Sequence, residues 1–161
     1  MRLPRRTRPP VEVAAGERVL AWAESGDGPV AGTRDALYLP GARIPWEEVE
    51  AADWDSEASV LRVSEVGSWG ATRPVHLIAL DSPGLLLELV RERVTASVVM
   101  QRHVRVRGRR GLRVIARRAP SGKLPLAWFY EYDDGIDPDD PLVRQAAGEA
   151  LTAAREEVGD A

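Results

Sequence analysis

Short apolar runs separated by turn residues fill the first half of the chain. The runs cover residues 19–23, 29–33, 36–39, 43–46, 49–54, 60–66 and 73–80. Glycine and proline punctuate them at 25–28 and 40–41, where these residues supply the backbone angles of tight hairpins. The pattern predicts about seven antiparallel strands.

The period of the pattern changes after residue 80. Asp81 and Ser82 are N-cap residues, and Pro83 suits the first helical position because its missing N–H would be unpaired there. An apolar stripe at three- and four-residue spacing follows, at Leu86, Leu89, Val90 and Val94. We therefore expect a helix that begins at Pro83 and buries one face.

Beyond this helix the strand pattern returns with arginine at alternate positions. Val104 and Val106 alternate with arginines, residues 108–111 form a turn, and 112–117 alternate again. This predicts an arginine-faced hairpin. An aromatic strand is expected over 127–132.

The last segment has both signals of a helix start. Asp140 is an N-cap residue and Pro141 suits the first turn. The apolar stripe then runs through Val143, Ala147, Leu151, Ala154 and Val158 to Gly159. A closing helix of about four to five turns follows from this spacing.

Two segments carry a resemblance to a known fold. Residues 30–39 read Val-Ala-Gly-Thr-Arg-Asp-Ala-Leu-Tyr-Leu, and residues 43–50 read Arg-Ile-Pro-Trp-Glu-Glu-Val-Glu. Over about 15–100 the chain resembles the bacterial pleckstrin-homology-like (PH-like) domains, and as a whole it is similar to a small family of uncharacterised actinobacterial proteins. The resemblance implies a fold but no mechanism.

The fold class expected from these features is α+β. A PH-like partial β-barrel of about seven antiparallel strands, capped by one helix, would be followed by a β-hairpin, one further strand and a C-terminal helix. We expect residues 1–10, rich in arginine and proline, to be flexible, and 11–161 to form a single domain. Within it, 15–100 would be the barrel with its helix, and 101–161 the remainder.

The positions of four of the five tryptophans suggest what each side chain does. Trp22, Trp46 and Trp54 lie on expected strands, so packing in the core or at its rim is their first interpretation. Trp69 lies between glycines in a loop, where an aromatic side chain is a candidate contact residue.

Charge is separated into blocks along the chain. Residues 94–130 hold nine basic residues and no acidic one, whereas residues 131–161 hold ten acidic residues and two arginines. The candidate partner-binding arginines all lie in the basic block, at Arg102, Arg105, Arg107, Arg109, Arg110, Arg113, Arg117 and Arg118.

Two interpretations of these arginines compete. They could bind the phosphates of nucleic acid or of lipid headgroups, because a guanidinium binds phosphate oxygens in pairs. Alternatively the acidic block folds back and neutralises them. We favour neutralisation, since the acidic block follows directly in sequence and the net charge of −3 is unusual for a polyanion binder.

Composition bounds the chemistry. With no cysteine and only His76 and His103, disulfides and thiolate metal sites are excluded. The acidic loop 133–140 resembles a calcium loop in composition alone, because its twelfth position is Arg144. Neither histidine has an evident orienting partner in the sequence, and no catalytic motif emerges. No metal or cofactor is therefore expected.

The function expected from the sequence is that of a non-enzymatic cytoplasmic binding module. It would present the arginine hairpin and the Trp69 loop to a protein or anionic partner. A nucleic-acid-associated protein using the hairpin of residues 102–118 on phosphate backbones is the alternative. No signal peptide or transmembrane segment is expected, and homo-oligomerisation stays open.

Overall fold

The computed structural model describes residues 11–66, 74–119 and 125–160. Residue contacts divide the chain into two compact units, Met1–Thr95 and Ala96–Ala161. Each unit is described by itself below.

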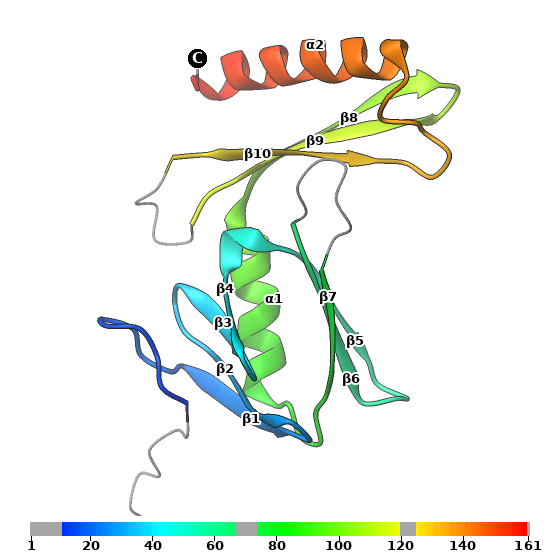
Figure 1. Ribbon diagram of the computed structural model, residues 1–161. Coiled ribbons are helices and arrows are strands. Elements are labelled where there is room, and N and C mark those ends of the chain that lie inside the picture. Colours follow the sequence, from blue (N-terminus) through cyan, green and yellow to red (C-terminus); the bar gives the residue numbers. More distant parts are fainter. Residues whose placement is uncertain (1–10, 67–73, 120–124, 161) are drawn as a thin grey trace, which may run out of the picture. The chain divides into compact units, whose positions relative to one another are not determined.

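Unit 1 contains two antiparallel sheets (Figure 1). The first is four-stranded, in the order β1 (Ala21–Ser25), β2 (Gly28–Gly32), β3 (Ala36–Leu39) and β4 (Ala42–Pro45). The second is three-stranded, in the order β5 (Val49–Asp55), β6 (Val60–Glu65) and β7 (Val75–Ala79). The seven expected strands are therefore confirmed within about two residues at their ends.

Neither sheet closes into a barrel, and the seven strands do not form one continuous sheet. A single 3-10 turn, Trp46–Glu48, interrupts the chain between β4 and β5, and β5 then pairs with β6 rather than with β4. An isolated antiparallel bridge pairs Ser25, the last residue of β1, with Leu80, which directly follows β7. The class α+β is confirmed in this coarser form.

Helix α1 spans Leu85–Ser97 and packs its predicted stripe inward. Leu86, Leu89 and Val90 are buried. The expected start at Pro83 is wrong by two residues, because Gly84 has a φ of +46° and lies outside the helical region. Pro83 instead accepts a hydrogen bond from the Leu86 amide at its carbonyl oxygen (2.9 Å), which forms the turn into the helix.

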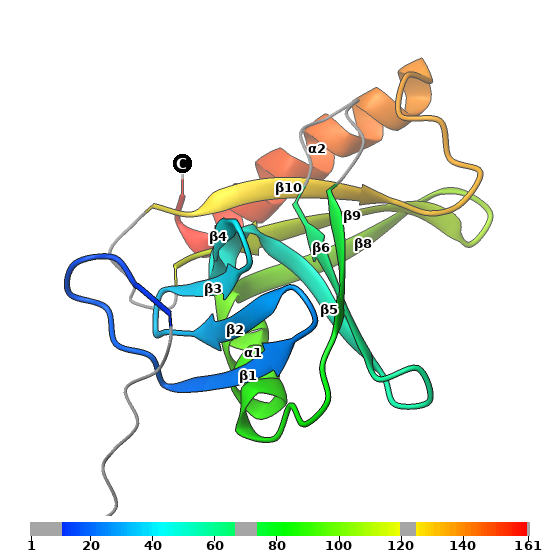
Figure 2. The ribbon, with the colours of Figure 1, turned by 60° about the horizontal axis from the view of Figure 1, so that its bottom comes forward.

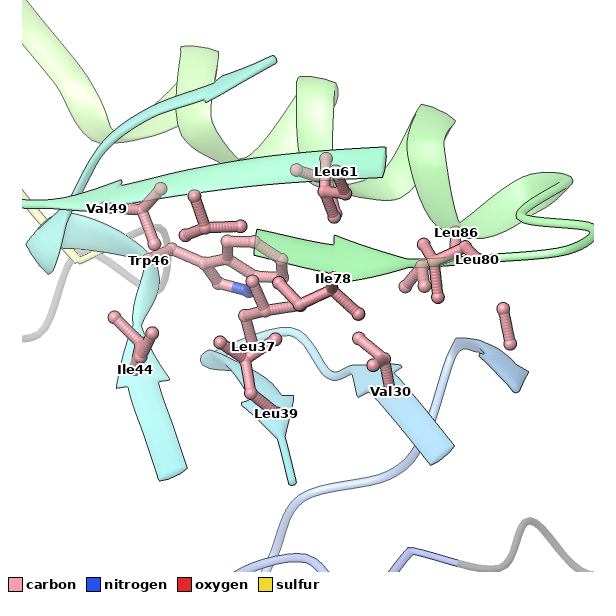
Figure 3. Packing of buried hydrophobic residues seen from close by; sticks show 13 residues of the cluster. Val30, Leu37, Leu39, Ile44, Trp46, Val49, Leu61, Ile78, Leu80 and Leu86 are labelled. Carbon is pink, nitrogen blue, oxygen red and sulfur yellow. The ribbon is translucent and has the colours of Figure 1, made fainter. Parts of the chain in front are cut away.

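The core of unit 1 lies between α1 and the two sheets, and Figure 3 shows the packing of its buried residues. Val30, Leu37 and Ile44 come from the first sheet, and Val49, Leu61 and Ile78 come from the second. Leu86 and Val90 of α1 complete the cluster. This sandwich buries the alternate apolar positions that define each strand.

The three tryptophans expected on strands have different environments, and Trp46 lies in the 3-10 turn that follows β4. Trp46 is fully buried at the centre of this cluster, and its Nε1 donates to the Thr33 carbonyl at 2.9 Å. Trp54 is partly buried against the cluster. Trp22 is 37% exposed. Packing is thus confirmed for Trp46 and Trp54, whereas Trp22 lies outside the core cluster.

Unit 2 is one antiparallel sheet covered by a helix. Its strands, in the order β10-β9-β8, are β8 (Val98–Arg107), β9 (Arg110–Arg117) and β10 (Ala127–Tyr132). Figures 1 and 2 both show helix α2 (Pro141–Val158) lying along one face of this sheet. Leu112 and Val114 of β9 pack there against Val143, Ala147 and other small residues of α2.

The caps of α2 are those expected from the sequence. The Asp140 side chain accepts from the Leu142 amide, and Gly159 ends the helix with a φ of +74°. Asp160, just beyond, accepts from Nε1 of Trp128 on β10 at 2.7 Å. The end of the helix is thereby tied to the sheet that its apolar stripe covers.

Candidate functional site

The β8–β9 hairpin carries the predicted site, and its alternation decides where each side chain lies. Met100, Val104 and Val106 of β8 belong to the cluster under α2, together with Leu112 and Val114 of β9. Because successive strand residues point to opposite faces, most arginines of the hairpin point away from the face that α2 covers. The arginine-faced hairpin is confirmed as an element.

Acidic residues of the last segment pair with two of these arginines. Arg107 Nη2 lies 2.5 Å from Asp140 Oδ2, and Arg102 forms an ion pair with Glu157 of α2. Arg110 Nη1 donates to the Asp134 carbonyl oxygen at 3.2 Å. The acidic block thus contacts the hairpin at all three arginines and supplies a carboxylate to two of them, Arg102 and Arg107.

His103 and Asp133 form a second link across the same region. His103 Nε2 lies 2.8 Å from Asp133 Oδ2, which also accepts from the Gly111 amide at 2.8 Å. The structure gives both histidines a partner that is not evident in the sequence, because His76 Nε2 likewise lies 2.8 Å from Glu65 Oε2. Each carboxylate is distant in sequence from its histidine and comes close only through strand pairing.

These contacts change the acidity of two aspartates. Hydrogen bonding to His103, followed by that from the Gly111 amide, lowers the pKa of Asp133 below its ordinary value. For Asp140 the hydrogen bond from Arg107 is the largest cause of a lowered pKa, followed by that from the Leu142 amide. Both carboxylates are therefore held in their charged form by the hairpin and the start of α2.

A pH titration followed at the Gly111 amide should report the protonation of Asp133, whose carboxylate accepts from this amide. A carboxyl group with a lowered folded pKa contributes stability above its unfolded pKa, and that contribution is lost as pH falls through the folded value. We expect the Gly111 amide proton resonance, followed by NMR, to shift with a midpoint below the ordinary aspartate value of about 3.9.

In Asp133→Asn this transition should disappear, because the side chain no longer titrates. A midpoint at or above the ordinary aspartate value in the unchanged protein would contradict the hydrogen-bonding pattern at Asp133.

The remaining arginines divide into a buried and an exposed set. Arg117 is 4% exposed and donates from Nη1 to Ser97 Oγ at 3.0 Å, so it does not face solvent. Arg113 is half-buried, and its charge contributes to the lowered pKa of Asp133. Arg105, Arg109 and Arg118 are exposed and form no ion pair with any residue that the structure describes.

Two of the exposed arginines lie together near the hairpin turn. Arg105 is opposite Gly111 in the strand register, and Arg109 lies in the turn between the strands. Arg118 follows the other end of β9. The candidate surface, called here the hairpin tip, therefore consists of Arg105 and Arg109 beside the paired Arg107 and Arg110.

Three other sequence-based expectations meet different outcomes. Trp69 lies outside the described residues. In the acidic loop, the Asp139 carboxylate pairs with the Arg144 guanidinium at 3.2 Å, and the Asp137 carboxylate accepts from the Asp139 amide at 2.9 Å. Within 11–66, 74–119 and 125–160, no group of three or more acidic or histidine side chains is arranged to hold a metal ion. None of the helices in these ranges is long and apolar enough to cross a membrane.

Comparison with protein-family models, with curated proteins and with solved structures finds no match to this chain.

Proposed function

We propose that the protein is a non-enzymatic cytoplasmic binding module, with a PH-like fold in unit 1 and a protein-binding hairpin tip in unit 2. The four-plus-three arrangement of antiparallel strands, followed by a helix that packs on both sheets, supports the PH-like assignment. The strand segments at 30–39 and 43–50 support it independently.

The observation that carries the binding proposal is the pairing pattern of the hairpin arginines. Arg107 and Arg110 are held by the acidic loop, while Arg105 and Arg109 beside them have no carboxylate partner among the described residues. A guanidinium needs no such partner at a solvated surface, but it offers five donors to a carboxylate of another molecule.

A protein partner fits this surface better than a polyanion does. Asp134, Asp137 and Asp139 are exposed in the loop that reaches the hairpin tip. Duplex DNA carries one negative charge for about every 1.7 Å of its axis, so a rigid duplex on the arginines would also meet these carboxylates. A protein surface can place one carboxylate between Arg105 and Arg109 and a basic side chain against the aspartates of the loop.

Binding of two probes separates the candidate partners. At low ionic strength a glutamate-rich peptide should bind, and Arg105→Ala and Arg109→Ala should each weaken its affinity about two- to fivefold, the range of an exposed ion pair. Arg34→Ala is the matched control, because Arg34 is exposed on unit 1 and its loss changes net charge equally. Fluorescence anisotropy gives each affinity.

The same titration with a DNA duplex tests the alternative. If the duplex binds more tightly than the peptide, and its salt slope falls by about one for each arginine removed, a nucleic-acid-associated protein replaces our proposal. Equal weakening by Arg34→Ala would remove the hairpin tip as the binding surface.

A further inference from the structure

A segment without regular secondary structure covers the outer face of the first sheet. Val11, Val13 and Val19 pack against Ala31, Ala36 and Tyr38, which point away from the core of unit 1. The Leu20 amide donates to the Gly32 carbonyl at 2.9 Å and fixes the end of the segment to β2. Residues 11–20, called here the strap, thus lie on the sheet, with a turn at Ala15 and Gly16 closed by a hydrogen bond from the Glu17 amide to the Ala14 carbonyl at 3.0 Å.

The strap places one carboxylate into a polar site on that face. Glu17 Oε1 accepts from Thr33 Oγ1 at 2.6 Å, and Oε2 accepts from Tyr38 Oη at 2.8 Å and from Arg43 Nη2 at 3.1 Å. The Glu17 side chain is only 4% exposed. Burial raises the pKa of Glu17, but the hydrogen bonds from Thr33, Tyr38 and Arg43 together lower it by more, so the pKa of Glu17 lies below its ordinary value.

The three donors are oriented by the sheet itself. Tyr38 and Arg43 are cross-strand neighbours on β3 and β4, Arg43 Nε lies 3.1 Å from Tyr38 Oη, and the guanidinium carbon lies 5.8 Å from the ring centroid. Thr33 Oγ1 accepts from the Asp35 and Ala36 amides at 3.1 Å each, and its acceptors are Glu17 Oε1 at 2.6 Å and, at the longer distance of 3.4 Å, the Ala36 carbonyl oxygen. Apart from the hydrogen bond that Thr33 donates to it, none of these contacts involves Glu17.

We infer that Thr33, Tyr38 and Arg43 form a carboxylate-binding site, which Glu17 fills in cis and which accepts a carboxylate from solution or from another chain when Glu17 is removed. The Arg43 side chain is 40% exposed, so the site opens to solvent on that side. When the Glu17 carboxylate is removed, the Thr33 hydroxyl and the Arg43 guanidinium lose this acceptor. Binding of a replacement anion restores their hydrogen bonds and is therefore favoured. This inference is independent of the hairpin tip.

Chemical rescue tests the site. Glu17→Ala in the full chain should have a lower Tm than the unchanged protein, and acetate or formate should raise it, by roughly 3 °C at ten times the dissociation constant. Chloride at equal ionic strength should not. The double variant Glu17→Ala/Arg43→Ala should not respond to acetate, because its site has lost the cation.

The source of the carboxylate is distinguished by a second arm. Because the strap of Glu17→Ala still covers the sheet, the second ligand must be small enough to enter the site beside it: N-acetylglutamate amide, with N-acetylglutamine amide as its control. A larger Tm rise with the glutamate derivative than with acetate identifies the ligand as an acidic side chain. Rescue by acetate without rescue by the glutamate derivative identifies a small-carboxylate site.

The proposal is overturned if acetate and formate act no better than chloride, or if the double variant responds equally. Should Glu17→Ala fail to fold in buffer, recovery of its far-UV circular dichroism with increasing acetate replaces Tm as the readout. Absence of recovery up to concentrations at which acetate changes the unmodified protein would then be the contradicting result.

Discussion

Replacing Gly111 by alanine is expected to cost roughly 3–5 kcal/mol of stability or to prevent unit 2 from folding. A Cβ at this position would lie 1.8 Å from the Val104 carbonyl oxygen and 2.9 Å from its carbon. Both atoms belong to the backbone of the paired strand, so no side-chain rotation relieves the overlap. Strand β8 would have to move away from β9.

The contacts of Gly111 make this movement more damaging. Its amide donates to Asp133 Oδ2 at 2.8 Å, and its carbonyl accepts from the Asp133 amide at 2.9 Å. The strand register shifts nearby, between Arg105 and Arg107, so the two strands are already irregular at this point. Displacement of Gly111 would therefore loosen the hairpin tip and the acidic loop together.

Gly148→Ala is the matched control for the Gly111 variant. Gly148 lies inside α2, and a Cβ there would meet nothing within 4 Å. Because alanine is the better helix former, we expect a gain of about 0.5–1 kcal/mol. Urea unfolding measures both variants, and a Gly111→Ala protein as stable as the unchanged one would show that β8 and β9 do not approach as described.

The second large effect is expected for Trp46→Ala. The indole is fully buried, and its removal leaves both a cavity and an unsatisfied Thr33 carbonyl oxygen, which now accepts from Nε1. Comparable truncations of core aromatic residues cost about 3–5 kcal/mol. Unit 1 should therefore unfold at a much lower urea concentration.

Trp22→Ala removes the same side chain from a partly exposed position and is expected to cost about 1–2 kcal/mol, less than Trp46→Ala does. Trp22 lies on β1 with 37% of its surface exposed and is not part of the core cluster, so its removal leaves no fully buried cavity. Equal destabilisation by the two variants would contradict the position of Trp46 at the centre of the core.

Local signals account for the elements that the sequence predicted well. The start of α2 depends on Asp140 and Pro141, and its end on Gly159, all within one turn of the helix boundary. Helix α1 begins two residues after the expected start because Gly84 has a positive φ, and the Pro83-Gly84 dipeptide is a turn signal as well as a helix-start signal. Strand β8 begins at Val98, earlier than the alternation at Val104 and Val106 indicates. A register shift between Val98 and Met100 interrupts the alternation there, so the sequence pattern does not show the first part of the strand.

The candidate site depends on contacts that no local pattern encodes. The arginines of the hairpin are visible in the sequence as a charge block, but which of them are paired depends on where α2 and the acidic loop lie. Glu17 meets Thr33 and Arg43 across 16 and 26 residues, and its burial follows from sheet register. Glu12 and Glu17 are both glutamates of the strap, and nothing in the local sequence shows that Glu17 is the one that enters the site.

Asp140 joins two parts of unit 2 through its two oxygens. Oδ1 accepts from the Leu142 amide and caps α2, while Oδ2 accepts from Arg107 at the hairpin tip. Asparagine would cap the helix as well as aspartate does but would bring no negative charge. The residue at position 140 is thus constrained twice, and the charge requirement set by the hairpin limits which of the good capping residues the helix can use.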